Sequence, residues 1–204
     1  VGEFIKNLKK GTVFRENIMK LFNVYNSLNV ENSMIFIVDM QEKLMPVIEN
    51  SEEIINNNVK LIKLANILNI PVTVTEQYPI GLGYTVKELK ELLNYDRIYV
   101  KTSFSGLTGE VLKTLEEKEV NSVILSGVET HICVLFTARE LIDKGYEVYL
   151  LEDCVSSRRL SNKVNALNQL NKIGVNITNF ETVAFDLIKS SEHENFREIS
   201  KLIK

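Results

Sequence analysis

The chain has 204 residues, of which 45% are apolar and 25% are charged. This length suits one folded domain, and the composition is that of an ordinary globular protein rather than a disordered or fibrous one. The formal net charge of -3 provides no basic field for a phosphate backbone. We therefore expect a small-molecule substrate rather than nucleic acid as the main partner.

The two cysteines, Cys133 and Cys154, are too few to stabilise a secreted disulfide scaffold of this size. No run of about 20 apolar residues suits a membrane span, and the first residues lack the charged-then-apolar order of a secretory signal. We therefore expect a cytoplasmic protein with no membrane partner. Mitochondrial import stays open as an alternative, although residues 1–32 contain acids, in which transit peptides are poor.

In chain order, residues 1–32 form an N-terminal extension in which apolar side chains such as Ile5, Leu8 and Phe14 predict a helix. Residues 33–204 form the main domain, where apolar runs alternate with segments of helical spacing. The asparagines Asn56–Asn58 are interpreted as surface residues. The six predicted strands are Met34–Met40, Val72–Gln77, Ile98–Lys101, Ser122–Gly127, Glu147–Leu151 and Val175–Asn179.

Several of these strands are apolar on both faces, as in a parallel sheet covered by helices on both sides. The predicted fold is therefore α/β, a three-layer α/β/α sandwich with a doubly wound, mainly parallel six-stranded sheet. In such a sheet, ligands bind beyond the carboxyl ends of the strands. Three chemically useful side chains lie there: Asp39 ends the first strand, Lys101 ends the third, and Cys133 follows the fourth.

The position of Cys133 distinguishes it from an ordinary buried cysteine. Thr130 is predicted to cap a helix, which places Cys133 in its first turn, where free N–H groups and the helix dipole favour a thiolate. His131, two residues earlier, points to another face and is interpreted as a packing or pocket-rim residue. Two isolated histidines do not supply a zinc site, so no metal is expected.

Four segments in order resemble the isochorismatase-like cysteine hydrolases: IVDMQEKL, KTSFSGL, SGVETHICV and GYEVYLLEDCVSSR. The resemblance covers about residues 33–185 and implies a catalytic trio of Asp39, Lys101 and Cys133. It also implies an oxyanion hole made by the backbone N–H groups of Glu129 and Cys133, with a cis peptide between Val128 and Glu129. Members of the family commonly form closed homo-oligomers, so a homo-oligomer is expected.

Departures from the family patterns narrow the predicted chemistry. The metal-dependent nicotinamidases carry an Asp-x-His-x-His type motif where this chain reads TEQYPIGLG, and isochorismatase proper lacks the nucleophilic cysteine. The chain therefore resembles a metal-free, poorly characterised branch without a cofactor, in which the thiol attacks a small amide, carbamoyl or related C–N substrate. Gln77, Tyr78 and Phe104 are candidate substrate-binding residues, with structural support as the alternative.

Two other functions are alternatives to hydrolysis. The chain can be a catalytically silent binding or assembly protein that retains the fold, attached to a partner through its extension. The intact trio favours an enzyme. RNA processing is the third possibility, and the acidic balance and the lack of basic clusters with interleaved aromatic residues do not favour it.

Overall fold

A computed structural model of the protein describes residues 27–93 and 98–204. The predicted N-terminal helix falls mainly on residues 1–26, which lie outside the described residues. The rest of the extension contains the short 3-10 helix η1 (Val30–Asn32). Within the described ranges, no helix is long and apolar enough to cross a membrane.

Six strands form one sheet in the order β3-β2-β1-β4-β5-β6. Every neighbouring pair is parallel, which confirms the predicted doubly wound sheet and extends it from mainly parallel to fully parallel. The strands are β1 (Ser33–Val38), β2 (Val72–Gln77), β3 (Ile98–Lys101), β4 (Ser122–Val128), β5 (Glu147–Ser156) and β6 (Asn176–Thr178).

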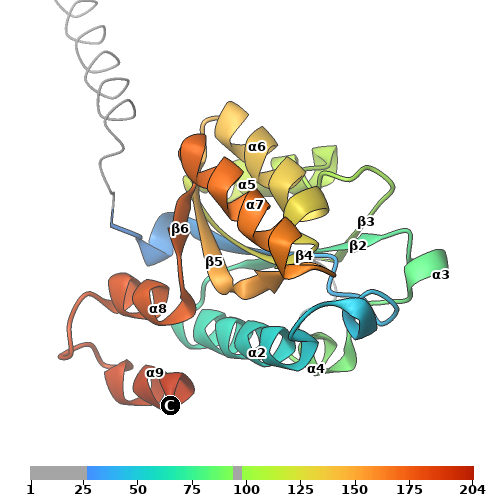
Figure 1. The fold of residues 1–204 in the computed structure, drawn as a ribbon. Helices are drawn as coiled ribbons and strands as arrows, with labels where there is room; N and C mark the ends of the chain where they lie inside the picture. Colours follow the sequence, from blue (N-terminus) through green and yellow to red (C-terminus); the bar gives the residue numbers. More distant parts are fainter. Residues whose placement is uncertain (1–26, 94–97) are drawn as a thin grey trace, which may run out of the picture.

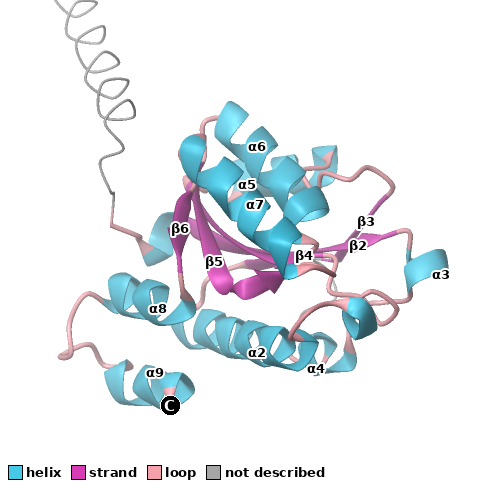
Figure 2. Ribbon diagram, viewed as in Figure 1, coloured by secondary structure: helices cyan, strands magenta, loops and turns pink. Residues whose placement is uncertain are grey.

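Helices cover both faces of the sheet and give the predicted three layers (Figures 1 and 2). Each face buries its own apolar core, as the two-sided hydrophobic strands require. One layer contains α2 (Ser51–Leu68), α4 (Lys87–Lys90), α8 (Phe180–Ile188) and α9 (Phe196–Ile203). The other contains α5 (Gly109–Glu117), α6 (Leu135–Asp143) and α7 (Leu160–Lys172).

Short helical segments lie in the loops that follow the strands. They are η2 (Met45–Val47) after β1, α3 (Pro79–Leu82) after β2, and the π-helix η4 (Thr130–Val134) after β4. In Figure 1, α3 projects from the end of the sheet at which β2 and β3 finish. These loops lie at the carboxyl edge of the strands, where the candidate site residues are expected.

The order in which successive strands are added changes side between β1 and β4, which are parallel neighbours in the centre of the sheet. Gly127 of β4 pairs with Val38 there and has φ +111°. A Cβ at this position would lie 2.1 Å from the carbonyl oxygen of Val38. Only glycine therefore lets the two strands approach this closely beside Asp39, the residue that follows Val38.

Two predictions about the sequence pattern are wrong. Asn58 is not a surface residue: it is fully buried, and its Nδ2 donates hydrogen bonds to the carbonyl oxygens of Ile54 and Cys154. Strand β5 also runs beyond the predicted end at Leu151. The polar residues Glu152 and Asp153, which follow Leu151, resemble the end of a strand. In the structure the Asp153 carboxylate accepts a hydrogen bond from the backbone N–H of Phe180 at the start of α8.

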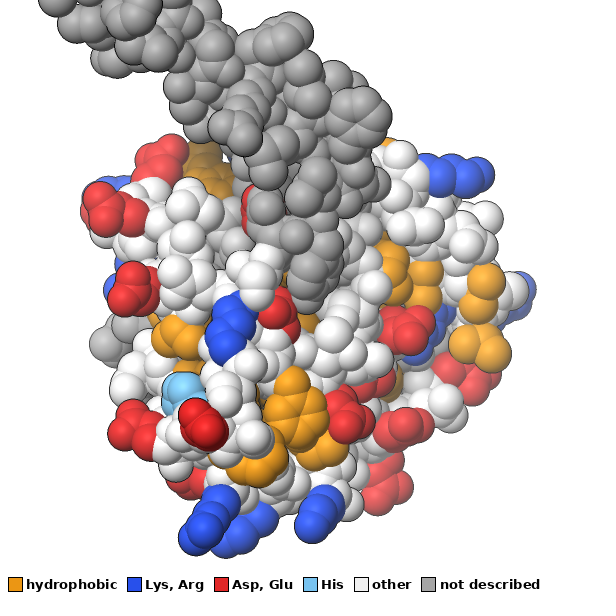
Figure 3. Space-filling model, turned by 90° about the vertical axis from the view of Figure 1, so that its left-hand side faces the viewer, with side chains coloured by type: hydrophobic (Ala, Val, Ile, Leu, Met, Phe, Trp, Pro, Cys, Tyr) orange, Lys and Arg blue, Asp and Glu red, His pale blue; other side chains and the backbone are white. Residues whose placement is uncertain are grey.

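The face that carries α8 and α9 displays hydrophobic side chains among charged and neutral ones (Figure 3). Phe185 of α8 and Phe196 of α9 pack there with ring centroids 6.1 Å apart. The Asp186 carboxylate of α8 accepts hydrogen bonds from the Ser27 hydroxyl and the Leu28 N–H. The first described residues are therefore attached to the same layer as the C-terminal helices.

Candidate active site

The sheet brings Asp39, Lys101 and Cys133 together at its carboxyl edge. Asp39 directly follows β1, and Cys133 lies in η4 after the neighbouring strand β4. Lys101 ends β3, two strands away from β1. Its long side chain spans β2, and its Nζ lies 2.6 Å from Asp39 Oδ2.

The Asp39 carboxylate is held on both oxygens. Oδ2 pairs with Lys101, whereas Oδ1 accepts a 2.8 Å hydrogen bond from the Thr75 hydroxyl. Asp39 has φ +52°, a conformation that aspartate adopts more readily than most residues. Thr75 is not among the site residues predicted from the sequence. Its position in a buried strand was the available signal, because a buried hydroxyl needs a polar partner.

Cys133 lies in the first turn of the helix after β4, as predicted, but Thr130 is not the cap. Glu129 occupies the cap position, and Thr130 is the first residue of a π-helical turn that continues into α6. Asp39 and Lys101 both lie close enough to the Cys133 thiol to shift its pKa. The Cys133 side chain is therefore directed at the carboxylate–ammonium pair, although the residue is only 8% exposed.

The predicted thiolate is wrong for the free protein. Burial, with the nearby charge of Asp39, raises the pKa of Cys133 to about 12, and this outweighs the lowering effect of Lys101. Burial also raises the pKa of Asp39, against the opposing charge of Lys101. The resting site therefore holds a protonated thiol beside a carboxylate whose proton affinity is higher than that of an exposed aspartate.

The predicted oxyanion segment precedes Cys133. The peptide bond between Val128 and Glu129 is cis. The Glu129 carboxylate accepts hydrogen bonds from the backbone N–H of Arg158, at 2.9 Å, and from its Nε, at 3.1 Å to the same oxygen. Arg158 thus fixes the side chain of the residue whose N–H is a candidate oxyanion donor.

His131 has both ring nitrogens engaged away from the trio. Nε2 lies 3.2 Å from Asn162 Nδ2, and Nδ1 lies 3.0 Å from Ser157 Oγ. These contacts agree with the interpretation of His131 as a packing or rim residue.

The three candidate substrate-binding residues lie on the same edge but differ in their surroundings. The side-chain amide of Gln77 contacts Lys101 Nζ at 2.7 Å and the Thr102 carbonyl at 2.9 Å. Tyr78 and Phe104 are 53% and 60% exposed. The Phe104 ring packs against Phe136 of α6, one helical turn after Cys133, with a centroid distance of 6.4 Å.

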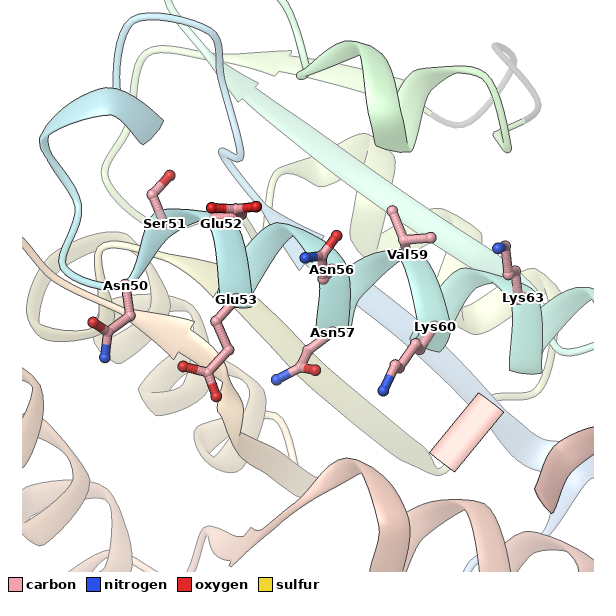
Figure 4. A pocket seen from close by; sticks show the side chains of 9 residues that line it. All are labelled: Asn50, Ser51, Glu52, Glu53, Asn56, Asn57, Val59, Lys60 and Lys63. Atoms are coloured by element: carbon pink, nitrogen blue, oxygen red, sulfur yellow. The ribbon is translucent and has the colours of Figure 1, made fainter. Parts of the chain in front are cut away.

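One open hollow on the surface lies away from the trio. It has a volume of about 890 Å³ and follows α2 (Figure 4). The trio does not contribute to it. Its lining residues are Asn50, Ser51, Glu52, Glu53, Asn56, Asn57, Val59, Lys60 and Lys63.

Another hollow, of about 350 Å³, is lined by Arg158, Arg159 and Asn162. Two of these residues contact the segment that precedes Cys133, since Arg158 binds Glu129 and Asn162 contacts His131. Across the described ranges, no group of three or more His, Cys, Asp or Glu side chains is arranged to hold a metal ion.

The amino-acid sequence of the chain was compared with those of known protein families. Residues 33–182 match the isochorismatase domain. The chain belongs to the isochorismatase family. An isochorismatase domain-containing protein 1 from Danio rerio is 41% identical over 210 residues, covering 100% of this chain and 74% of the relative.

Solved structures of isochorismatase-like proteins have the same fold as this chain. The MAR1 ribonuclease from Caenorhabditis elegans superposes with a TM-score of 0.84 at 41% identity, over 87% of this chain and 92% of that one. The YcaC gene product of Escherichia coli, described as an octameric hydrolase of unknown specificity, has a TM-score of 0.83 at 22% identity, over 88% and 90% of the two chains. At that identity the likeness supports the fold alone.

Proposed function

We propose that this isochorismatase-family protein is a cysteine hydrolase of a small amide, carbamoyl or related C–N substrate. The observation that carries the proposal is the position of one thiol beside a buried carboxylate–ammonium pair, with the three residues supplied by three separate strands or the loops after them. A carboxylate of raised pKa beside a protonated thiol is the arrangement that general-base activation of a nucleophile requires.

In the proposed reaction, Asp39 takes the proton from Cys133 as the sulfur attacks the carbonyl carbon. The C–N bond then breaks, and the proton passes from Asp39 to the leaving nitrogen. The product at this stage is a thioester on Cys133. Asp39 next accepts a proton from water, whose oxygen attacks the thioester carbon. The C–S bond breaks to release the acid, and Asp39 returns its proton to the sulfur, which restores the free thiol.

Other residues have supporting roles in this proposal. The backbone N–H groups of Glu129 and Cys133 stabilise the developing oxyanion, an interaction whose loss typically costs about 10²–10³ in rate. Tyr78 and Phe104 are exposed at the same edge and contact the substrate. Lys101 keeps Asp39 ionised inside the protein, where an unpaired carboxylate would hold its proton.

Covalent trapping tests the nucleophile directly. Cys154→Ala leaves Cys133 as the only thiol, because the chain has two cysteines. We expect a substrate-like amide or carbamate with an electrophilic leaving group to add one acyl group to this variant, located on Cys133 by peptide mapping. A screen of amides, ureas and carbamates for ammonia release then identifies the substrate class.

Cys133→Ser is the control, and it is expected to lose both labelling and turnover while remaining folded. Labelling of Cys154 in the wild-type protein before Cys133 would contradict the assignment, since Cys154 is fully buried. A protein that binds members of the panel tightly but is never acylated and releases no ammonia would be the catalytically silent alternative.

RNA cleavage is a second candidate because the relative from Caenorhabditis elegans, 41% identical to this chain, is called a ribonuclease. The wild-type protein and its site variants distinguish C–N hydrolysis from RNA cleavage. Under the hydrolase proposal, an RNA oligonucleotide stays intact with the wild-type protein. Cleavage that Cys133→Ser or Asp39→Asn abolishes would assign the site to RNA instead.

We also propose that the chain forms a homo-oligomer, as the description of the Escherichia coli protein suggests for that relative. Large apolar side chains at the surface, including Ile80 at 85% exposure, are available for a subunit contact. Light scattering at micromolar concentration should give a multiple of 23.3 kDa. A stable monomer would refute this.

A further inference from the structure

Lys101 has a complete set of oxygen partners inside the protein. Its Nζ contacts Asp39 Oδ2 at 2.6 Å and Gln77 Oε1 at 2.7 Å. The carbonyl oxygens of Ser103 and Phe104 lie at 3.1 Å and 3.3 Å. An ammonium group has three protons to donate, so these four acceptors leave none for a substrate oxygen. Lys101 therefore acts on the reaction through its charge and through Asp39.

Gln77 is the only partner of Lys101 among these four that is a neutral side chain, and it is firmly held. Residues 77 and 101 are paired in the β2–β3 register. The backbone N–H of Gln77 donates to Gln41 Oε1 at 2.7 Å, and its carbonyl accepts from Gln41 Nε2 at 3.0 Å. Gln41 is fully buried and also donates to the Gly83 carbonyl.

The orientation of the Gln77 amide follows from chemistry. Its Nε2 donates to the Thr102 carbonyl at 2.9 Å. The opposite orientation would place an NH₂ group against the Lys101 ammonium and a carbonyl against a carbonyl. Oε1 therefore faces Lys101, where it holds the cation without cancelling its charge. A carboxylate in this position would compete with Asp39 for the same ammonium group.

We propose that Gln77 is a positioning residue that keeps Lys101 aligned on Asp39, rather than a residue that contacts the substrate. The effect of Gln77 on the reaction rests on the proposed function. It would act through Lys101, whose charge opposes the rise in the pKa values of Asp39 and Cys133. A neutral acceptor leaves that full positive charge available to the two reacting groups.

The first test measures Lys101 itself, in the free protein, by NMR of the lysine ammonium groups. In the wild type we expect a slowly exchanging Lys101 signal, assigned by its loss in Lys101→Met. Gln77→Met keeps the side-chain length but removes the strong acceptor, and should make the ammonium protons exchange about tenfold faster or more. Gln169→Met is the matched control, since the half-buried Gln169 makes only solvent-exposed side-chain hydrogen bonds, with Arg139 and Asn165.

The second test is the pH profile of Cys133 alkylation by iodoacetamide, measured in a Cys154→Ala background. Gln77→Met should slow alkylation about threefold or more at a given pH and move the profile upward, because the cation is less well held beside the thiol. Gln77→Glu should do the same, by sharing Lys101 between two carboxylates. With a confirmed substrate, the variants should lower kcat and leave KM nearly unchanged.

An unchanged ammonium signal and alkylation rate in Gln77→Met would overturn the inference. An effect of Gln77→Glu without an effect of Gln77→Met would also overturn it, since the added negative charge would then account for the changed alkylation rate. If Gln77→Met does not fold, Gln77→Asn replaces it, because the shorter side chain cannot reach Lys101. The NMR measurement needs no substrate, so a failure of the hydrolase proposal is recognised separately, by absence of acylation in the wild type.

Discussion

Asp39→Asn is expected to lower turnover by about 10²–10⁴-fold while making Cys133 easier to alkylate. Turnover falls because an amide keeps the shape of the carboxylate but does not accept the proton of the thiol. Alkylation becomes faster because the charge of Asp39 raises the pKa of Cys133, and its removal leaves the thiol beside Lys101 alone. The two rates, measured on the same purified variant, should move in opposite directions.

Asp143→Asn is the matched control, since it removes an exposed carboxylate at the end of α6. It should change neither rate. Circular dichroism and urea unfolding establish that Asp39→Asn is folded, and Asp39→Glu, which retains a base, serves as a second variant. Near wild-type turnover in a folded Asp39→Asn protein would disprove the assigned base.

Lys101→Met is expected to reduce the free energy of unfolding by about 3–5 kcal/mol at neutral pH. Both side chains of the Lys101–Asp39 pair are fully buried, so removal of the cation leaves an uncompensated carboxylate in the interior. The exposed pair of Lys113 and Glu117 offers a matched control. Lys113→Met should cost at most about 0.5 kcal/mol, because solvent screens that pair.

The loss in Lys101→Met should depend on pH in a definite direction. Burial already raises the pKa of Asp39 above its ordinary value of 3.8, and without Lys101 it rises further. A carboxyl that binds its proton more tightly when folded contributes most stability below pH 3.8 and loses it as pH rises through the folded pKa. Urea unfolding should therefore show a larger deficit at pH 8 than at pH 5.

The double variant Asp39→Asn/Lys101→Met removes both charges and should recover part of the stability at pH 8. A deficit that is equal at both pH values, or that the double variant does not reduce, would show that Lys101 contributes by packing and not by its charge. Activity is lost in either variant under the proposed mechanism, so stability is the informative measurement here.

The sequence by itself determined the layer architecture and the strands that carry the site. Apolar runs separated by helical spacing require a covered parallel sheet, and polar residues that end such runs must lie at its carboxyl edge. This reasoning located Asp39, Lys101 and Cys133, and predicted β2 and β3 to their last residues. It failed for the end of β5, because the role of Asp153 depends on α8, which follows later in the chain.

Only the tertiary structure decided the protonation of the Cys133 thiol and the contacts of the residues around the trio. The sequence predicted a thiolate from the start of a helix, which is a local feature, whereas burial and the charge of Asp39 raise the pKa of Cys133. Likewise, the strand position of Gln77 indicated the correct edge but not its contact with Lys101. Proton affinities and hydrogen-bond partners depend on what is packed around a group, and sequence spacing determines only which edge the group reaches.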